Sequence, residues 1–184
     1  MILLNTKHNW LFMESNNVNQ LQERIAGLLK NKFADAFISA ETSYDFPVFV
    51  MDKSVLVEAL SYLKSDSETG FTFLTTLCGL HFPDNVDQEF GMMYQLHKLE
   101  TNERIRMKFF MSKNDMKVPT ITGLWPTANW MERQEYDFFG FKFTGHPDLR
   151  RILNMDEMNY FPMRKEYPLE DGSRDDKSDK MFGR

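Results

Sequence analysis

Cysteine is nearly absent from this sequence of 184 residues, and Cys78 is its single example. One thiol cannot close an internal disulfide, and without neighbouring ligands it cannot hold an iron–sulfur cluster or a structural zinc ion. We therefore expect a reducing, intracellular compartment and no metal or cluster bound by this chain.

Long apolar runs and an excess of basic charge are also missing. No run approaches the roughly 18–20 apolar residues that cross a bilayer. The formal net charge is −5, from 22 basic and 27 acidic residues, which argues against a general nucleic-acid-binding surface. With 42% hydrophobic residues, the chain is long enough to bury a core as one domain.

The motifs of the common cofactor classes do not occur. The sequence contains no GxGxxG, HExxH or CxxC, and the GxxxxG spacing from Gly140 to Gly145 is followed by His146 instead of Lys. A small acid–base enzyme that uses His81, Asp84 and Glu132 in a cleft remains an alternative.

Periodic apolar residues predict the regular elements. Helical spacing predicts helices over residues 17–32, 53–64 and about 127–139. Alternating or apolar runs predict strands over residues 34–40, 47–51, 71–82, 91–100 and 104–111. We expect 71–82 to be a central strand and 114–118 to be a turn. The predicted fold is one α+β domain with a mixed or antiparallel sheet over residues 34–121, helices on it and an extended C-terminal arm.

The chain changes character after Gly140. Glycines and prolines hinder long regular elements there, at Gly145, Pro147, Pro162 and Pro168. The same stretch is rich in apolar side chains that a free loop should not expose. We therefore divide the chain into an α+β domain (residues 1–140), an extended docking segment (141–170) with few contacts to residues 1–120, and a disordered tail (171–184).

Charges cluster on the third predicted helix and just after it. Glu132, Arg133 and Asp137 lie on the helix, and Arg150 and Arg151 follow in the loop. Their opposite signs and closeness in sequence predict ion pairs that fix the loop against the helix.

These residues also carry a resemblance to a known family. The matching positions are Trp125-Pro126, Ala128-Asn129-Trp130, Glu132-Arg133, Asp137-Phe138-Phe139-Gly140, Gly145-His146-Pro147-Asp148, Arg150-Arg151-Ile152-Leu153 and Arg164 to Leu169. In this run the chain resembles the 30 kDa subunit (also called the C subunit) of bacterial NADH:quinone oxidoreductase, respiratory complex I. It departs from the family at Gln134, where Glu is usual, so that this carboxylate is either not needed here or supplied by Glu135. It also departs at His81-Phe82, where Asp-Tyr is usual.

The resemblance implies a cofactor-free structural subunit of the hydrophilic arm, with NADH, FMN, iron–sulfur clusters and quinone on partner subunits. It implies packing chiefly on the large quinone-site subunit, no nucleic-acid partner, and a peripheral place on the cytoplasmic side of the inner membrane. Equivalent subunits occur in membrane-bound hydrogenase-type complexes, which is a second alternative. The resemblance assigns no catalytic, metal-binding or cofactor-binding residue to this chain. The residues expected to have partner-binding or structural roles are Trp130, Glu132, Arg133, Asp137, His146, Asp148, Arg150, Arg151, Arg164, Lys165 and Tyr167.

Overall fold

A computed structural model describes the backbone of residues 3–167 and the side chains of residues 17–167. The expected tail over 171–184 and the last three residues of the expected docking segment lie outside these residues. The helices are α1 (Leu3–Phe33), α2 (Leu56–Ser65) and α3 (Ala128–Phe139), with short 3-10 turns η1 (Ala34–Ala36) and η2 (Lys53–Val55). The strands are β1 (Phe37–Ser43), β2 (Phe46–Met51), β3 (Phe73–His81), β4 (Phe90–Lys98), β5 (Glu103–Met111), β6 (Lys117–Pro119) and β7 (Lys142–Thr144).

Five strands form one mixed sheet in the order β1-β2-β5-β4-β3. The β2–β5 pair is parallel, and the other neighbours are antiparallel. Residues 44–45 make the β1–β2 turn with positive φ angles of 50° and 62°, which the two-residue hairpins of antiparallel strands require. The predicted α+β class, with a mixed sheet in one domain, is confirmed.

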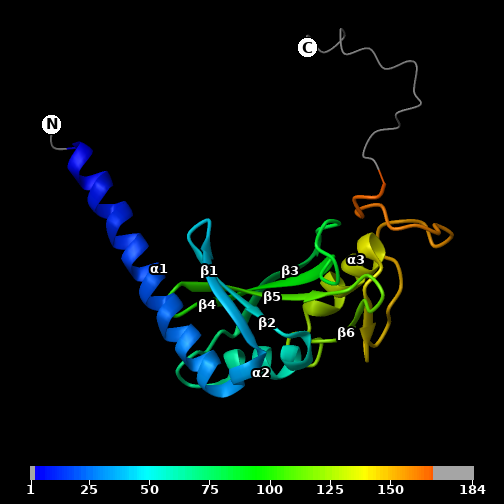
Figure 1. Ribbon diagram of the computed structural model, residues 1–184, viewed down its shortest axis with the longest axis horizontal. Coiled ribbons are helices and arrows are strands. Elements are labelled where there is room, and N and C mark those ends of the chain that lie inside the picture. The colour runs from blue at the N-terminus through cyan, green and yellow to red at the C-terminus, as the bar shows by residue number, and fades with distance from the viewer. Residues whose placement is uncertain (1–2, 168–184) are drawn as a thin grey trace, which may run out of the picture.

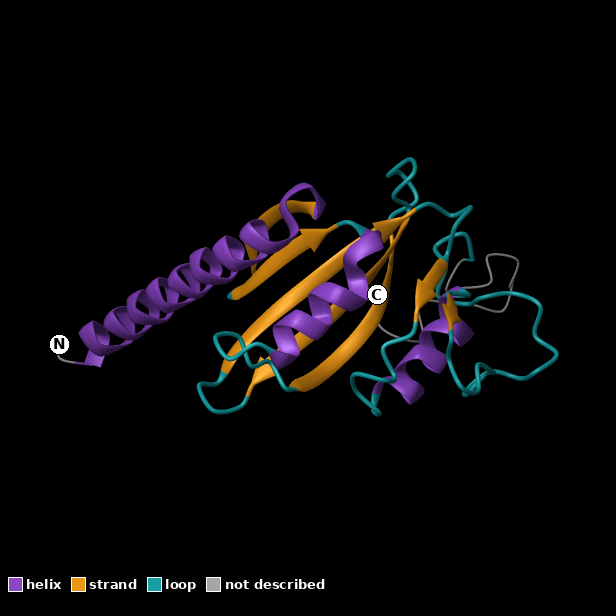
Figure 2. Cartoon of the chain, turned by 90° about the horizontal axis from the view of Figure 1, so that it is seen from below, coloured by secondary structure: helices purple, strands orange, loops and turns teal. Residues whose placement is uncertain are grey.

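The helices α1 and α2 lie on one face of this sheet (Figures 1 and 2). Alternate side chains of β5 point into that core, where Ile105, Met107 and Phe109 are fully buried, because successive strand residues face opposite sides. The helix α1 is longer than the predicted 17–32. Apolar spacing marks only the part that packs on the sheet, and Figure 1 shows the first half of α1 running out beyond it.

Two element predictions were wrong. The strand β3 is an edge strand and not a central one. It is apolar because α3 packs beside it, so the edge is covered by a helix. Part of the stretch expected to be a turn, at 114–118, forms β6, which pairs in parallel with β7 in a small second sheet.

The segment after α3 is tied to the domain more closely than expected. Gly140 ends α3 in the left-handed conformation with φ of 82°, where glycine is favoured. Phe141 and Phe143 then enter the hydrophobic core, with 0% and 3% of their surfaces exposed. The expectation of few contacts with residues 1–120 is therefore wrong for this stretch, because its aromatic side chains can be buried on its own domain.

Candidate functional site

Asp137, near the end of α3, organises the loop that follows. Its Oδ2 accepts hydrogen bonds from the backbone N–H groups of Ile152, Leu153 and Asn154, at 3.1, 2.8 and 2.9 Å. Burial alone would raise the pKa of the Asp137 carboxyl. These hydrogen bonds and the Arg151 guanidinium outweigh that effect and hold the pKa far below its usual value. Asp137 is therefore an ionised anchor for the loop.

Arg151 joins the end of α3 to the arm. Its Nη1 donates to Asp137 Oδ1 at 2.7 Å, and its Nη2 donates to the carbonyl oxygens of Met158 and Tyr160 at 2.6 and 3.1 Å. The guanidinium also lies 5.2 Å from the centre of the Phe161 ring, within the range of a cation–π contact. The predicted ion pair between Asp137 and Arg151 is confirmed.

The other expected ion pairs of this cluster do not form. Arg133 donates instead to the backbone carbonyls of Arg150 and Arg151, at 3.2 and 3.0 Å. The Arg150 side chain turns outward and pairs with Asp148 at 2.9 Å, with both side chains more than half exposed. Arg133 also lies 5.2 Å from the Trp130 ring, and Trp130 is 61% exposed. The arginine contacts are thus chiefly to backbone, a geometry that sequence separation does not reveal.

Glu132 is buried and has no arginine partner among the described side chains. Its two oxygens accept hydrogen bonds from the Ile121 N–H at 2.7 Å and the Thr120 hydroxyl at 2.6 Å. His146 lies 4.0 Å away, and its Nδ1 accepts from the Asp148 N–H while Nε2 faces the Asn129 carbonyl. Burial raises the pKa of Glu132, and these hydrogen bonds oppose the rise. Glu132 therefore links α3 by hydrogen bonds to residues 120–121, which precede the helix.

Glu135 is a second buried carboxyl of α3. Its Oε2 accepts a hydrogen bond of 2.6 Å from the backbone N–H of Gly79, on the edge strand β3. Burial raises the pKa of Glu135 to about 7, although the Gly79 hydrogen bond lowers it. A Cβ on residue 79 would lie 2.7 Å from Glu135 Oε2. The glycine inside a predicted strand was the only available signal of this close approach.

Arg164 and Lys165 hold the end of the arm against the domain. Arg164 Nε donates to the Phe139 carbonyl at 2.7 Å, and its guanidinium lies over the rings of Phe90 and Phe161, at 5.3 and 4.6 Å. The Lys165 N–H donates to His81 Nδ1 at 3.0 Å. Few contacts with residues 1–120 had been expected for this end of the arm as well, and the contacts to His81 and Phe90 show that this was wrong.

Of the ten exposed residues from 153 to 167, five are apolar and five are polar or charged. Five large side chains between residues 153 and 167 are exposed, and we call them the arm surface: Leu153 (68%), Met155 (70%), Tyr160 (41%), Met163 (55%) and Tyr167 (40%). The rings of Tyr160 and Tyr167 lie 5.2 Å apart. The arm surface is thus a set of apolar groups on a backbone that partly buried hydrogen bonds hold in place.

The residues considered for acid–base chemistry do not share a site. His81 stacks on Phe90 with ring centres 4.2 Å apart, and Asp84 lies in an exposed loop. Among the described residues, no hydrogen bond or ion pair joins His81, Asp84 and Glu132 to one another. Nor do the side chains of residues 17–167 include three metal-ligating groups placed to hold an ion.

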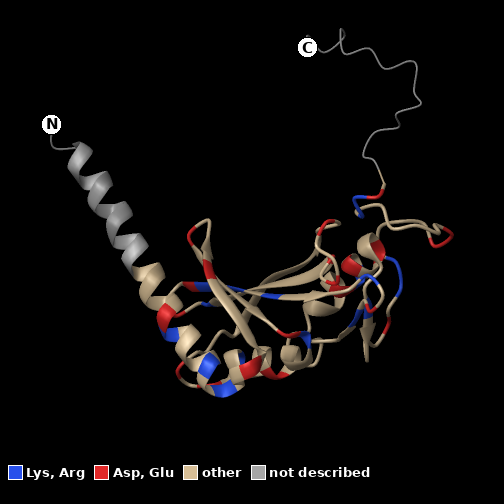
Figure 3. Cartoon of the chain, viewed as in Figure 1, with Lys and Arg blue, Asp and Glu red and all other residues tan. Residues whose placement is uncertain are grey.

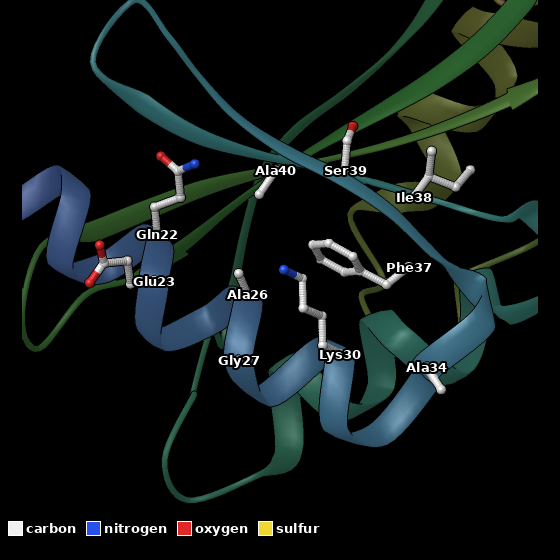
Figure 4. Close-up of a pocket in the computed structure, with 10 residues that line it drawn as sticks. All are labelled: Gln22, Glu23, Ala26, Gly27, Lys30, Ala34, Phe37, Ile38, Ser39 and Ala40. Atoms are coloured by element: carbon white, nitrogen blue, oxygen red, sulfur yellow. The ribbon is translucent and has the colours of Figure 1, made fainter.

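A hollow of about 700 Å³ lies at the other end of the sheet, between α1 and β1 (Figure 4). In it, Lys30 Nζ lies over the Phe37 ring at 5.2 Å. The remaining lining residues are Gln22, Glu23, Ala26, Gly27, Ala34, Ile38, Ser39 and Ala40. This lining offers one carboxylate and one amine without a convergent set of polar groups, so it has no features of a catalytic cleft.

The sequence matches a known family. The model of the family described as "Respiratory-chain NADH dehydrogenase, 30 Kd subunit" matches residues 49–173. The chain belongs to this family. Residues 49–173 of this 30 kDa family chain include all of α3 and the arm, where the network lies.

Relatives in the 30 kDa family agree along most of the chain. It is 36% identical over 142 residues to the NADH-quinone oxidoreductase C subunit 2 of Rhizobium etli (strain CIAT 652), which covers 77% of this chain and 74% of the relative. It is 34% identical over 152 residues to the NADH-quinone oxidoreductase C subunit 1 of Rhizobium meliloti (strain 1021), which covers 83% of this chain and 75% of the relative.

Solved structures have the same fold. A trypsin-resistant fragment of Nqo5 aligns with a TM-score of 0.59 at 30% identity, over 68% of this chain and 99% of the fragment. A chain of the membrane-bound sulfane sulfur reductase, an archaeal respiratory membrane complex, aligns with a TM-score of 0.66 at 22% identity, over 80% and 85%. That second likeness concerns the fold alone. Within residues 3–167 of this 30 kDa family chain, no helix has the length and hydropathy to cross a membrane.

Proposed function

We propose that this chain is a structural subunit in the hydrophilic arm of a proton-translocating NADH:quinone oxidoreductase. In this proposal it packs chiefly on the large subunit that forms the quinone site and supports the passage of electrons from NADH to quinone. NADH, FMN, the iron–sulfur clusters and quinone are bound by other subunits, and this chain contributes no catalytic residue or cofactor. Its partners hold it at the cytoplasmic side of the inner membrane. Family membership and the names of its relatives support the proposal.

The arm surface is the observation that carries the docking role. Its five apolar side chains are exposed while the backbone beneath them is hydrogen-bonded to Asp137 and Arg151. Arg164 of the same segment donates to the Phe139 carbonyl of α3. Apolar anchors at the centre of an interface supply much of the binding energy. A segment already held in its binding conformation loses less entropy on association. The arm surface therefore suits an apolar groove on a partner subunit, with Arg150 and Asp148 at its polar rim.

The test changes the arm surface without touching the network beneath it. Leu153→Glu with Met155→Glu places two charges among the exposed apolar groups. The variant chain is expressed in cells that lack the native one, and the complex is purified from detergent-solubilised membranes. We expect at least about tenfold less variant chain in the complex, because buried unpaired charges oppose association.

The matched control is Ile38→Glu with Leu99→Glu, which are apolar residues of similar exposure, 56% and 59%, outside the arm. We expect this control to assemble as the native chain does. Normal incorporation of the Leu153/Met155 variant, or equal loss of the control, would contradict docking through the arm surface.

A further inference from the structure

One face of the five-stranded sheet has no helix on it within the described residues, whereas α1 and α2 cover the other (Figures 1 and 2). We call it the open face. Strand register assigns its side chains to four cross-strand rows. The first three are Phe73, His97 and Arg104, then Thr76, Gln95 and Arg106, then Cys78, Met93 and Lys108. A fourth row contains Leu80, Gly91 and Phe110.

The open face is not composed like a solvated sheet face. An antiparallel sheet with one wet side normally alternates apolar residues inward with polar residues outward. Here the outward residues on β3, on β4 and near the end of β5 include Cys78, Leu80, Met93 and Phe110, which are partly exposed. Phe82, just beyond β3, is 39% exposed, and its ring centre lies 6.1 Å from that of Phe110. Lys165 Nζ lies 5.6 Å from the centre of the Phe82 ring, so the arm borders this largely apolar half of the open face.

Close packing fixes the apolar half in place. A Cβ on Gly91 would lie 2.9 Å from the Phe110 ring, so this ring occupies the space that a side chain at residue 91 would fill. An aromatic ring held in place in this way offers apolar contact area at little cost in side-chain entropy.

The charged half of the open face has one dominant sign, in a chain whose net charge is negative. Arg104, Arg106 and Lys108 occupy every second position along β5 (blue in Figure 3). Their Cα atoms are therefore spaced about 6.8 Å apart. Glu41 pairs with Lys108 at 3.0 Å, and Arg106 lies over the Phe46 ring at 4.3 Å. Arg104 is exposed, and the acceptor it contacts is the neutral Asn102 at 3.4 Å. A surface that complements this row must carry carboxylates.

We propose that the open face is a second docking surface, which binds another protein subunit through carboxylates that meet β5 and apolar side chains that cover Met93, Phe110 and Phe82. The proposal rests on the chain being part of a larger assembly, as in the proposed function. The open face is on the opposite side of the sheet from α2, and the proposal uses no residue of the arm surface. Charge complementarity sets the partner's orientation, and the apolar half supplies contact area.

Hydroxyl-radical labelling tests the two surfaces separately in one sample. Oxidation of Met93 reports on the open face, and oxidation of Met155 reports on the arm surface. Oxidation of Tyr62 reports on α2, on the other side of the sheet. We expect the labelling of Met93 to be at least about fivefold lower in the assembled complex than in the free full-length chain, because an interface excludes solvent from the side chains it buries. Protection of Met155 with unchanged Met93 labelling would overturn the open-face proposal and leave arm docking standing. Unchanged labels at both methionines would count against the proposed function as well.

Two further outcomes identify a different occupant or cause. If Met93 is protected in the free chain in proportion to protein concentration, a second copy covers the open face and the proposal is wrong. Equal protection of Tyr62 would show general burial of the chain and would also overturn it.

A charge variant tests the complementarity. Arg104→Glu should reduce incorporation into the complex by about tenfold at low salt, with a smaller deficit at high salt because the repulsion is screened. Lys117→Glu changes the same charge at an exposed position of β6 and should assemble normally. The unfolding midpoint of each free variant shows whether it is folded. A folded Arg104→Glu chain that assembles as well as the Lys117→Glu chain would contradict the proposal.

Discussion

Arg151 and Asp137 lie 2.7 Å apart at the end of α3, and only 8% and 0% of their side chains are exposed to solvent. Since both charges are buried, each depends on the other. Asp137→Ala should lower the free energy of unfolding by about 3–5 kcal/mol, because Arg151 is left as an unpaired buried cation. Chemical denaturation of the full chain measures this change.

The Arg150–Asp148 pair is the matched comparison, since it has the same chemistry at the surface. Asp148→Ala should change the free energy of unfolding by less than about 1 kcal/mol. The Asp137 contribution should also depend on pH. Its pKa is lowered in the folded state, so the stabilisation is present above the unfolded pKa near 4 and is lost as the pH falls below it. A similar effect of both substitutions would refute a special role for the buried pair.

Glu135 should oppose folding at alkaline pH. Its folded pKa is about 7, above the unfolded value of 4.5, so protonation favours the fold and the penalty grows as the pH rises from 4.5 through 7. Glu135→Gln keeps an oxygen that can accept from the Gly79 N–H and removes the charge. We expect the variant to be more stable than the native chain by about 1–3 kcal/mol at pH 8, and by only a few tenths near pH 4.5.

Urea denaturation of the two chains across this pH range measures the difference. A constant difference would mean that Glu135 has the same pKa in the folded and unfolded states, contrary to the effect of its burial.

Gly79 and Gly27 offer a paired test of backbone approach. A Cβ at residue 79 would meet Glu135, Phe139 and another ring within 2.8 Å, whereas one at residue 27 has nothing within 4 Å. Gly79→Ala should destabilise the chain by about 1–3 kcal/mol through overpacking between β3 and α3. Gly27→Ala should stabilise it by up to about 1 kcal/mol, because alanine is the better residue inside a helix. Thermal unfolding of both variants decides whether the two signs are opposite.

Much of this fold follows from local sequence patterns. The alternation of Ile105, Met107 and Phe109 predicted β5 and its buried face, and Gly140 predicted the end of α3. These features depend on neighbours in sequence. The position of β3 at the sheet edge does not, because an apolar strand looks the same whether another strand or the helix α3 covers it.

The site was harder to predict for the same reason. Opposite charges suggested that Arg133 and Arg150 would pair with the acidic side chains of α3. Instead, Arg133 bonds to backbone carbonyls of the loop, and Arg150 pairs with Asp148 within that loop. Periodicity cannot give such loop conformations. The prolines after Gly140 correctly indicated an irregular segment, but they did not reveal that Arg164 would fix it to its own domain.

Arg164 should control how firmly the end of the arm is held. Its guanidinium donates to the Phe139 carbonyl and lies over the rings of Phe90 and Phe161, with 15% of the side chain exposed. Arg164→Ala removes these contacts while leaving the Asp137–Arg151 pair intact. Losing a hydrogen bond from a charged donor costs about 1.5–3 kcal/mol. The Lys165 N–H, which donates to His81, should therefore exchange with solvent at least about tenfold faster.

Lys165→Ala provides the control, because residue 165 binds His81 through its backbone and not its side chain. We expect nearly native exchange at that amide in this variant, measured by NMR on the full-length chain. Arg164→Ala should also reduce incorporation into the membrane complex although it changes no residue of the arm surface, since a loosened arm must be ordered again on binding. If amide 165 is equally protected in the Arg164→Ala and Lys165→Ala chains, Arg164 does not hold the arm, and the arm surface must be fixed by Asp137 and Arg151 alone.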